Sequence, residues 1–118
     1  MIVIVSALAL VLAWPASSAV NPKPTPRAIA HWKTIALKPP KEEGFWKGYL
    51  SGMNAHLTSC KFMRSRGVVF YDCRVTGRID GTVFAFAALA RLSRCQYAST
   101  LSSTQGSHTL TRRFRFCG

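Results

Sequence analysis

The stretch CKFMRSRGVVFYDC, which runs from Cys60 to Cys73, predicts a β-hairpin closed by a disulfide. A two-residue turn at its Arg-Gly pair, residues 66–67, sets the two cysteines opposite each other without further adjustment. That pair falls on a non-hydrogen-bonded position of an antiparallel ladder, where Cα atoms lie about 4.5 Å apart, and this spacing suits a disulfide. The same register sets Lys61 opposite Asp72, which is a favourable cross-strand charge pair.

A zinc site is the alternative interpretation of these cysteines, because His56, Cys60 and Cys73 are all suitable ligands. The chain contains no Cys-x-x-Cys motif, which redox-active couples typically use. An oxidising compartment also disfavours free thiolates. We therefore favour the disulfide, and we expect neither a bound metal nor another cofactor.

The beginning of the chain predicts an export signal. Residues 2–14 are apolar apart from Ser6, and small residues follow at 17–19, where a signal peptidase would cleave. The apolar run is shorter than the roughly 20 residues of a membrane-spanning helix, so we expect no stable transmembrane anchor. No lysine or arginine precedes the run, which leaves an uncleaved N-terminal anchor as the alternative. The prediction is a signal peptide over residues 1–19 and a secreted protein, either extracellular or periplasmic.

The rest of the chain is expected to form a proline-rich linker over residues 20–26 and a single domain over residues 27–118. So small a domain has a marginal core, and small exported domains often compensate with disulfides. The domain holds all four cysteines of the chain: Cys60, Cys73, Cys95 and Cys117. Three pairings are open to four cysteines. The simplest joins neighbours, residue 60 to 73 and residue 95 to 117.

Two further turns, at Asp80-Gly81 and at residues 105–107, predict an antiparallel β-meander after residue 55. The five expected strands span residues 56–65, 68–79, 82–92, 94–103 and 108–117. Residues 27–37 have the spacing of a short helix, and residues 41–54 suit either a helix or a glycine-rich loop. The predicted fold class is therefore α+β, a five-stranded meander with a short N-terminal helical or irregular cover. The alternative is a small all-β sheet or barrel.

The turn at Asp80-Gly81 also predicts a register for the second hairpin. It places Val75 opposite Phe86, so that Tyr71, Val75 and Phe86 share a core face. In the last strand, the alternation predicts one apolar face and one basic face. The apolar face carries Leu110, Phe114 and Phe116, and the basic face carries Arg113 and Arg115.

The charge of the chain favours an anionic partner. Sixteen Lys and Arg residues oppose four acidic residues, which gives a net charge of +12, and all of the basic residues lie after residue 20. Arginine predominates in the strand region, and its planar guanidinium suits phosphate and carboxylate groups. The candidate anion-binding residues are Arg74, Arg78, Arg112, Arg113 and Arg115. They would form one cationic patch if their strands project them from the same side of the sheet.

These features predict a small secreted cationic binding protein, similar to an effector or antimicrobial protein. Its partner would be an anionic surface, glycan or nucleic acid, or a protein, and the sequence specifies no oligomeric state. The first alternative is a secreted inhibitor or structural interaction module that contacts a protein through loops 64–67 and 104–107. The second is a ribonuclease-like hydrolase that uses His56, His108 and Lys61. We expect no enzyme, because no catalytic motif stands out.

Overall fold

The structure, a computed structural model, describes residues 22–38, 44–77, 81–106 and 108–118. The predicted signal peptide and the first two linker residues lie outside this part of the chain. The elements are α2 (Pro26–Ile35), α3 (Gly44–Met53), β1 (His56–Ser65), β2 (Val68–Thr76), β3 (Val83–Arg91), β4 (Gln96–Ser103) and β5 (Thr109–Arg115).

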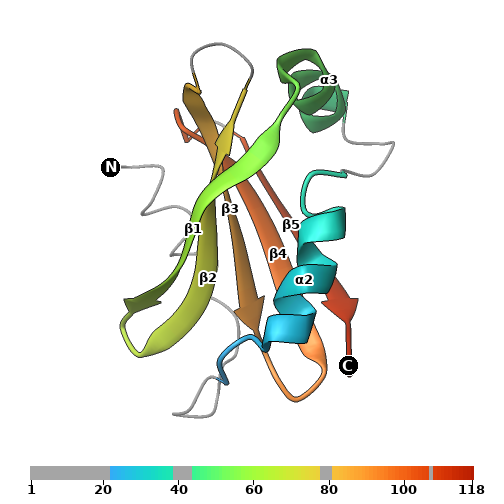
Figure 1. The fold of residues 1–118 in the computed structure, drawn as a ribbon, viewed down its shortest axis with the longest axis vertical. Helices are drawn as coiled ribbons and strands as arrows, with labels where there is room; N and C mark the ends of the chain where they lie inside the picture. The colour runs from blue at the N-terminus through green and yellow to red at the C-terminus, as the bar shows by residue number, and fades with distance from the viewer. Residues whose placement is uncertain (1–21, 39–43, 78–80, 107) are drawn as a thin grey trace.

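The five strands form one antiparallel sheet in the order β1-β2-β3-β4-β5, as the predicted meander requires. Both helices lie on the same face of this sheet (Figure 1). The prediction of an α+β fold with a five-stranded antiparallel sheet is confirmed. The barrel alternative is wrong, because β1 and β5 are the two unpaired edges of an open sheet.

The first hairpin has the predicted register between its turn and the pair formed by Lys61 and Asp72. Arg66 and Gly67 both have positive φ, 50° and 82°, as the central residues of a type I′ turn require. The Cys60–Cys73 disulfide is present, with its Cα atoms 4.0 Å apart. The ladder is irregular between Thr58 and Lys61, where the chain forms a bulge.

The second hairpin is shifted by one residue from the predicted register. Val75 lies opposite Ala85 rather than Phe86, and the ladder is irregular between Val75 and Thr76. Because side chains alternate between the two faces of a strand, this shift turns the side chains of β3 over. Ala85 and Leu89 therefore face the helices, and Phe86 lies on the other face with Arg74. The prediction is therefore wrong for Phe86, whereas Tyr71 and Val75 do face the helix-side core.

The last hairpin is also shifted by one residue from the register that would set Cys95 opposite Cys117, with Tyr97 opposite Phe114. The Cys95–Cys117 disulfide still forms, because both cysteines lie just beyond the ends of the paired strands, with their Cα atoms 4.8 Å apart. The predicted faces of β5 are confirmed. The apolar residues of its first face pack against the helix-side core, whereas Arg113 is exposed on the opposite side.

Helix α2 begins at an N-cap that the sequence analysis did not identify. The side-chain oxygen of Thr25 accepts a hydrogen bond from the Ala28 backbone N–H at 3.1 Å, and Pro26 occupies the first helical turn. On the buried face of the helix, the Trp32 indole N–H donates to the Ser99 hydroxyl oxygen on β4 at 2.8 Å. This buried bond attaches α2 to the sheet above β4 and β5.

Helix α3 shows that residues 44–53 of the segment 41–54 are helical, and residues 41–43 lie outside the described residues. Trp46 and Leu50 are buried against the sheet, and Asn54, with a φ of 53°, follows the helix in the left-handed conformation common at helix ends. The glycine stripe lies on the opposite side, since a Cβ built at Gly44, Gly48 or Gly52 would meet nothing within 4 Å. The glycines thus face outward and do not allow a closer approach to the sheet.

The helix-side core consists mainly of two tryptophans over small and branched sheet residues. Its largest fully buried side chains are Trp32, Trp46, Val75, Leu89, Tyr97 and Leu101. A smaller cluster occupies the opposite face of the sheet. Its buried members are Val68, Phe70, Ala88, Ala90 and Ala98.

Candidate anion-binding site

The arginines predicted to bind anions do not form one compact patch. Arg74 on β2 and Arg113 on β5 are both exposed and project from the face opposite the helices. Strands β3 and β4 separate them, which corresponds to roughly 14 Å across the sheet. Arg78 lies outside the described residues.

Arg112 points the other way, toward the helices. Its Nη2 donates a hydrogen bond to the Ile35 carbonyl oxygen at the end of α2, at 3.1 Å. Burial lowers the pKa of its guanidinium, but an arginine side chain remains charged at neutral pH. A cation at a helix C-terminus satisfies an otherwise unpaired carbonyl and interacts favourably with the helix dipole. Arg112 therefore helps to fix α2 on the sheet.

A second set of basic residues gathers at one end of the molecule. Successive turns of a meander alternate between the two ends of the sheet, so the β1–β2 and β3–β4 turns lie at the same end, together with the start of α2 (Figure 1). We call this end the basic end. Its cationic residues are Lys23, Arg27, Arg64, Arg66, Arg91, Arg94 and Arg115.

The sequence analysis predicted only Arg115 of this set as an anion-binding residue. The signal that it left unused was position relative to the turns. Arg64 and Arg66 lie at the connection between the first two expected strands, and Arg91 and Arg94 lie at the connection between the third and fourth; in a meander these two connections share an end.

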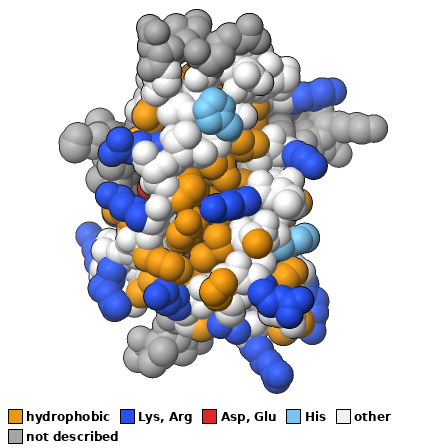
Figure 2. All heavy atoms as spheres, in the orientation of Figure 1, with side chains coloured by type: hydrophobic (Ala, Val, Ile, Leu, Met, Phe, Trp, Pro, Cys, Tyr) orange, Lys and Arg blue, Asp and Glu red, His pale blue; other side chains and the backbone are white. Residues whose placement is uncertain are grey.

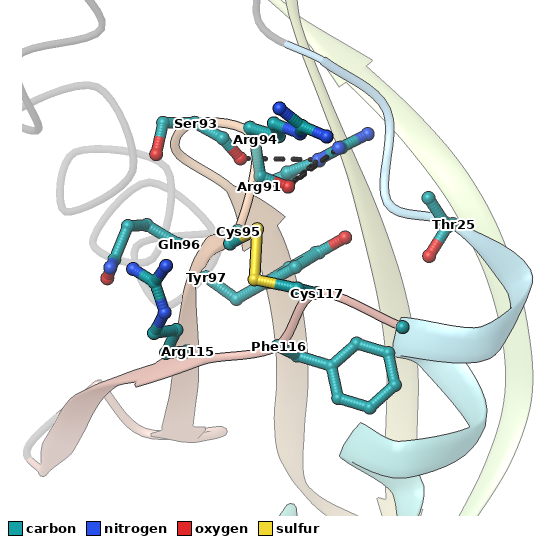
Figure 3. Close-up of a pocket in the computed structure, with 11 residues that line it drawn as sticks. Thr25, Arg91, Ser93, Arg94, Cys95, Gln96, Tyr97, Arg115, Phe116 and Cys117 are labelled. Atoms are coloured by element: carbon teal, nitrogen blue, oxygen red, sulfur yellow. Dashed lines mark hydrogen bonds between the residues drawn. A yellow bond between two sulfur atoms is a disulfide. The ribbon is translucent and has the colours of Figure 1, made fainter.

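A cavity of about 590 Å³ lies at the basic end, around the Cys95–Cys117 disulfide (Figure 3). It is lined by Thr25, Arg91, Ser93, Arg94, Cys95, Gln96, Tyr97, Arg115, Phe116, Cys117 and Gly118. Three of these side chains are guanidinium groups and none is a carboxylate. Thr25 is the N-cap of α2, so the positive end of the helix dipole also lies at the cavity.

Arg91 is held in place by backbone carbonyl groups (Figure 3). Its Nη2 donates to the Arg94 carbonyl oxygen at 2.7 Å, and its Nε donates to the Ser93 carbonyl oxygen at 3.2 Å. Its Nη1 also reaches the carbonyl oxygen of Lys23 at 3.4 Å. Arg91 therefore contributes a fixed positive charge, whereas Arg94 and Arg115 are exposed at the rim of the cavity.

The acidic residue within the described ranges, Asp72, lies away from this end. It sits on β2 opposite Lys61 and Ala88, near the middle of the sheet. Burial raises the pKa of its carboxyl to about 6, although the charges of Lys61 and Arg74 act in the opposite direction. In the described part of the chain, no carboxylate side chain therefore neutralises the basic end.

The histidines considered for catalysis are not brought together. His56 begins β1 and His108 precedes β5, and these are the opposite edges of the sheet. His108 stacks on Phe45 of α3, with ring centroids 3.6 Å apart. His31 stacks on Phe116 with a centroid distance of 4.8 Å.

The zinc alternative is wrong for Cys60 and Cys73, because these two sulfurs are bonded to each other. Within the described ranges, no three His, Cys, Asp or Glu residues are grouped as a metal site would require. The described helices are too short and too polar for any of them to cross a bilayer.

Comparison with known proteins gives no relative from which a function could be transferred. The chain matches no protein-family model, no curated protein and no solved structure.

Proposed function

We propose that this protein is a small exported cationic protein that binds polyanions through its basic end. The observation that carries the proposal is the cavity that Arg91, Arg94 and Arg115 line, with no carboxylate side chain among the lining residues. Such a site attracts phosphate, sulfate or carboxylate groups, and guanidinium groups can bind these anions through two parallel hydrogen bonds. The two disulfides and the net charge of +12 support this role.

The local structure supports binding by pre-formed charges. Arg91 is fixed by three backbone carbonyls, so its charge needs little further ordering when an anion arrives. The Cys95–Cys117 disulfide ties the end of β5 to the β3–β4 turn, and this link keeps Arg115 near Arg94. Arg94 and Arg115 are exposed and are therefore the groups that would contact the polyanion directly.

The two alternative functions receive less support. Loops 64–67 and 104–107 belong to turns at opposite ends of the sheet, so a single small protein partner would not easily contact both. A ribonuclease-like mechanism needs groups that exchange a proton within hydrogen-bond reach of one substrate. His56 and His108 lie on the opposite edge strands instead.

The test is the salt-dependent affinity for heparin of the Arg94→Gln/Arg115→Gln double variant. The matched control is Arg74→Gln/Arg113→Gln, which removes the same charge from exposed positions on the face opposite the helices. We expect the basic-end variant to bind about tenfold more weakly than wild type, and the control to lose much less. Equal losses in the two variants would mean that net charge alone drives binding, and the proposed site would be wrong.

A further inference from the structure

The helices leave one part of the sheet uncovered on their own side. Helix α2 is attached above β4 and β5, through the Trp32–Ser99 and Arg112–Ile35 hydrogen bonds. The β1–β2 hairpin lies beside α2 and is not covered by it (Figure 1). Here Phe62 is 41% exposed, and the neighbouring Tyr71 is half-buried.

The exposed aromatic residues of this region have cationic neighbours. The Lys23 ammonium lies 4.2 Å from the centroid of the Phe62 ring, and the Lys33 ammonium lies 5.7 Å from that of Tyr71. Arg64 projects from the same face of β1, since it is two residues beyond Phe62. We call Lys23, Lys33, Phe62, Arg64 and Tyr71 the hairpin patch. In Figure 2, a hydrophobic strip crosses this face of the molecule with lysine and arginine side chains around it.

The two aromatic rings of the patch are held in place by the hairpin and by Trp32. The Cys60–Cys73 disulfide and the type I′ turn fix the hairpin on both sides of Phe62. The Phe62 ring packs edge-on against Tyr71, with centroids 5.0 Å apart, and Tyr71 packs in the same way against the buried Trp32 at 6.1 Å. The rings are therefore already ordered before a partner binds, which lowers the entropic cost of association.

We propose that the hairpin patch is a docking surface for an anionic lipid bilayer. Phe62 enters the boundary between headgroups and acyl chains, while Lys23, Lys33 and Arg64 contact the lipid phosphates. The combination of an exposed ring and surrounding cations favours this partner, because a dissolved polyanion would use the charges and leave the ring in water. This inference goes beyond the proposed function, since it adds an apolar contact through Phe62; the patch shares Lys23 and Arg64 with the basic end, and Phe62, Tyr71 and Lys33 are its own.

The experiment measures partitioning of the chain without the predicted signal peptide, residues 1–19, because their apolar run would itself bind lipid. The vesicles are of phosphatidylcholine, with and without about a third of phosphatidylglycerol. The variants are Phe62→Ser and the matched control Phe45→Ser, because Phe45 is 40% exposed on α3 at the opposite end of the molecule. We expect Phe62→Ser to partition about tenfold more weakly onto the anionic vesicles, and Phe45→Ser to stay close to wild type. Neither substitution should change the affinity for heparin.

A second measurement keeps the proposal falsifiable if Phe62→Ser folds poorly. The fluorescence difference between Phe62→Trp and wild type should be quenched by lipids brominated near the headgroup end of the acyl chains. The proposal would be overturned if Phe62→Ser partitioned onto anionic vesicles as strongly as wild type, or if the added tryptophan of Phe62→Trp were not quenched. Either result would leave the separate proposal of heparin binding at the basic end standing. Binding of the patch to a dissolved protein, without vesicle binding, would likewise overturn it and assign the patch to a protein partner.

Discussion

Replacing Asp72 by asparagine is expected to stabilise the protein near neutral pH. Burial raises the pKa of the Asp72 carboxyl to about 6, and this desolvation outweighs the opposing charges of Lys61 and Arg74. The ionised carboxylate is therefore unfavourable in the folded protein. Asparagine has nearly the same shape and carries no charge, so Asp72→Asn removes this cost while it keeps the side chain in place.

The sign of the pH dependence follows from where the proton binds more tightly. The folded carboxyl has a pKa of about 6, whereas the unfolded one has a pKa of about 3.9. Its contribution to the free energy of unfolding is therefore fully present below about pH 4 and is lost as the pH rises through about 6. A difference of this size sets a ceiling of about 3 kcal/mol. Because Asp72 is only half-buried, solvent screening reduces the expected effect to about 1 kcal/mol.

Urea unfolding between about pH 4 and pH 8 measures this effect. Asp72→Asn should gain about 1 kcal/mol over wild type near pH 8 and show no gain near pH 4. Lys61→Gln is a useful second variant, because it removes a charge that lowers the Asp72 pKa and should make the decline with pH steeper. Parallel stability curves for wild type and Asp72→Asn over the whole range would refute the reasoning.

Two substitutions test the packing of the helices on the sheet. Ser99→Ala removes the acceptor of the buried Trp32 indole N–H and should lower the free energy of unfolding in urea by about 1–3 kcal/mol. The control Ser51→Ala, at an exposed position, should change it little. Equal stabilities of these two variants would contradict the role of the Trp32–Ser99 bond. Gly77→Ala places a Cβ 3.0 Å from the Met53 carbonyl oxygen and should cost about 1–3 kcal/mol in thermal unfolding. In Gly48→Ala the new Cβ meets nothing within 4 Å, so this variant should be stabilised by about 0.5–1 kcal/mol. If Gly77→Ala were instead the more stable of the two variants, the close contacts described at Gly77 would be contradicted.

The first hairpin was predictable because its information is local. A two-residue turn admits few geometries, and a positive φ at both central residues selects the type I′ turn that matches the twist of the strands. The number of residues between Cys60 and Cys73 then fixes the disulfide. The bulge between Thr58 and Lys61, which includes Cys60 itself, was not predictable, because the turn fixes the pairing only as far as Lys61 and nothing in the sequence marks the positive φ of Ser59.

The register of the second hairpin was not predictable, because β3 is apolar on both of its faces. Its sequence, VFAFAALAR, contains no alternation of polar and apolar residues that would favour one register over a shift by one residue. The two helices were also hard to predict from local sequence. The N-cap at Thr25 lies inside a proline-rich segment, and the structure of residues 44–53 depends on the contacts of Trp46 and Leu50 with the sheet rather than on helix propensity.

The one-residue shift also explains why the candidate site was missed. In the predicted register, the side chain of Arg91 would lie on the face opposite Val75 and away from the helices. In the observed register, Leu89 lies opposite Tyr71, and Arg91 lies opposite Tyr97, so the arginine projects toward the helix side of the sheet.

This orientation is what allows the cavity to form. From the helix side, the Arg91 guanidinium reaches the Lys23 carbonyl oxygen just before α2, as well as the carbonyl oxygens of its own turn. It thus fixes the β3–β4 turn to the segment that leads into Thr25, and Arg94 and Thr25 then line the same cavity. The irregularity between Val75 and Thr76, at the far end of the sheet, therefore decides on which face of the sheet Arg91 lies. A sequence argument that treats each turn separately cannot find such a site. The face on which Arg91 lies depends on the register of β2 with β3 along their whole length, including the irregularity at the far end.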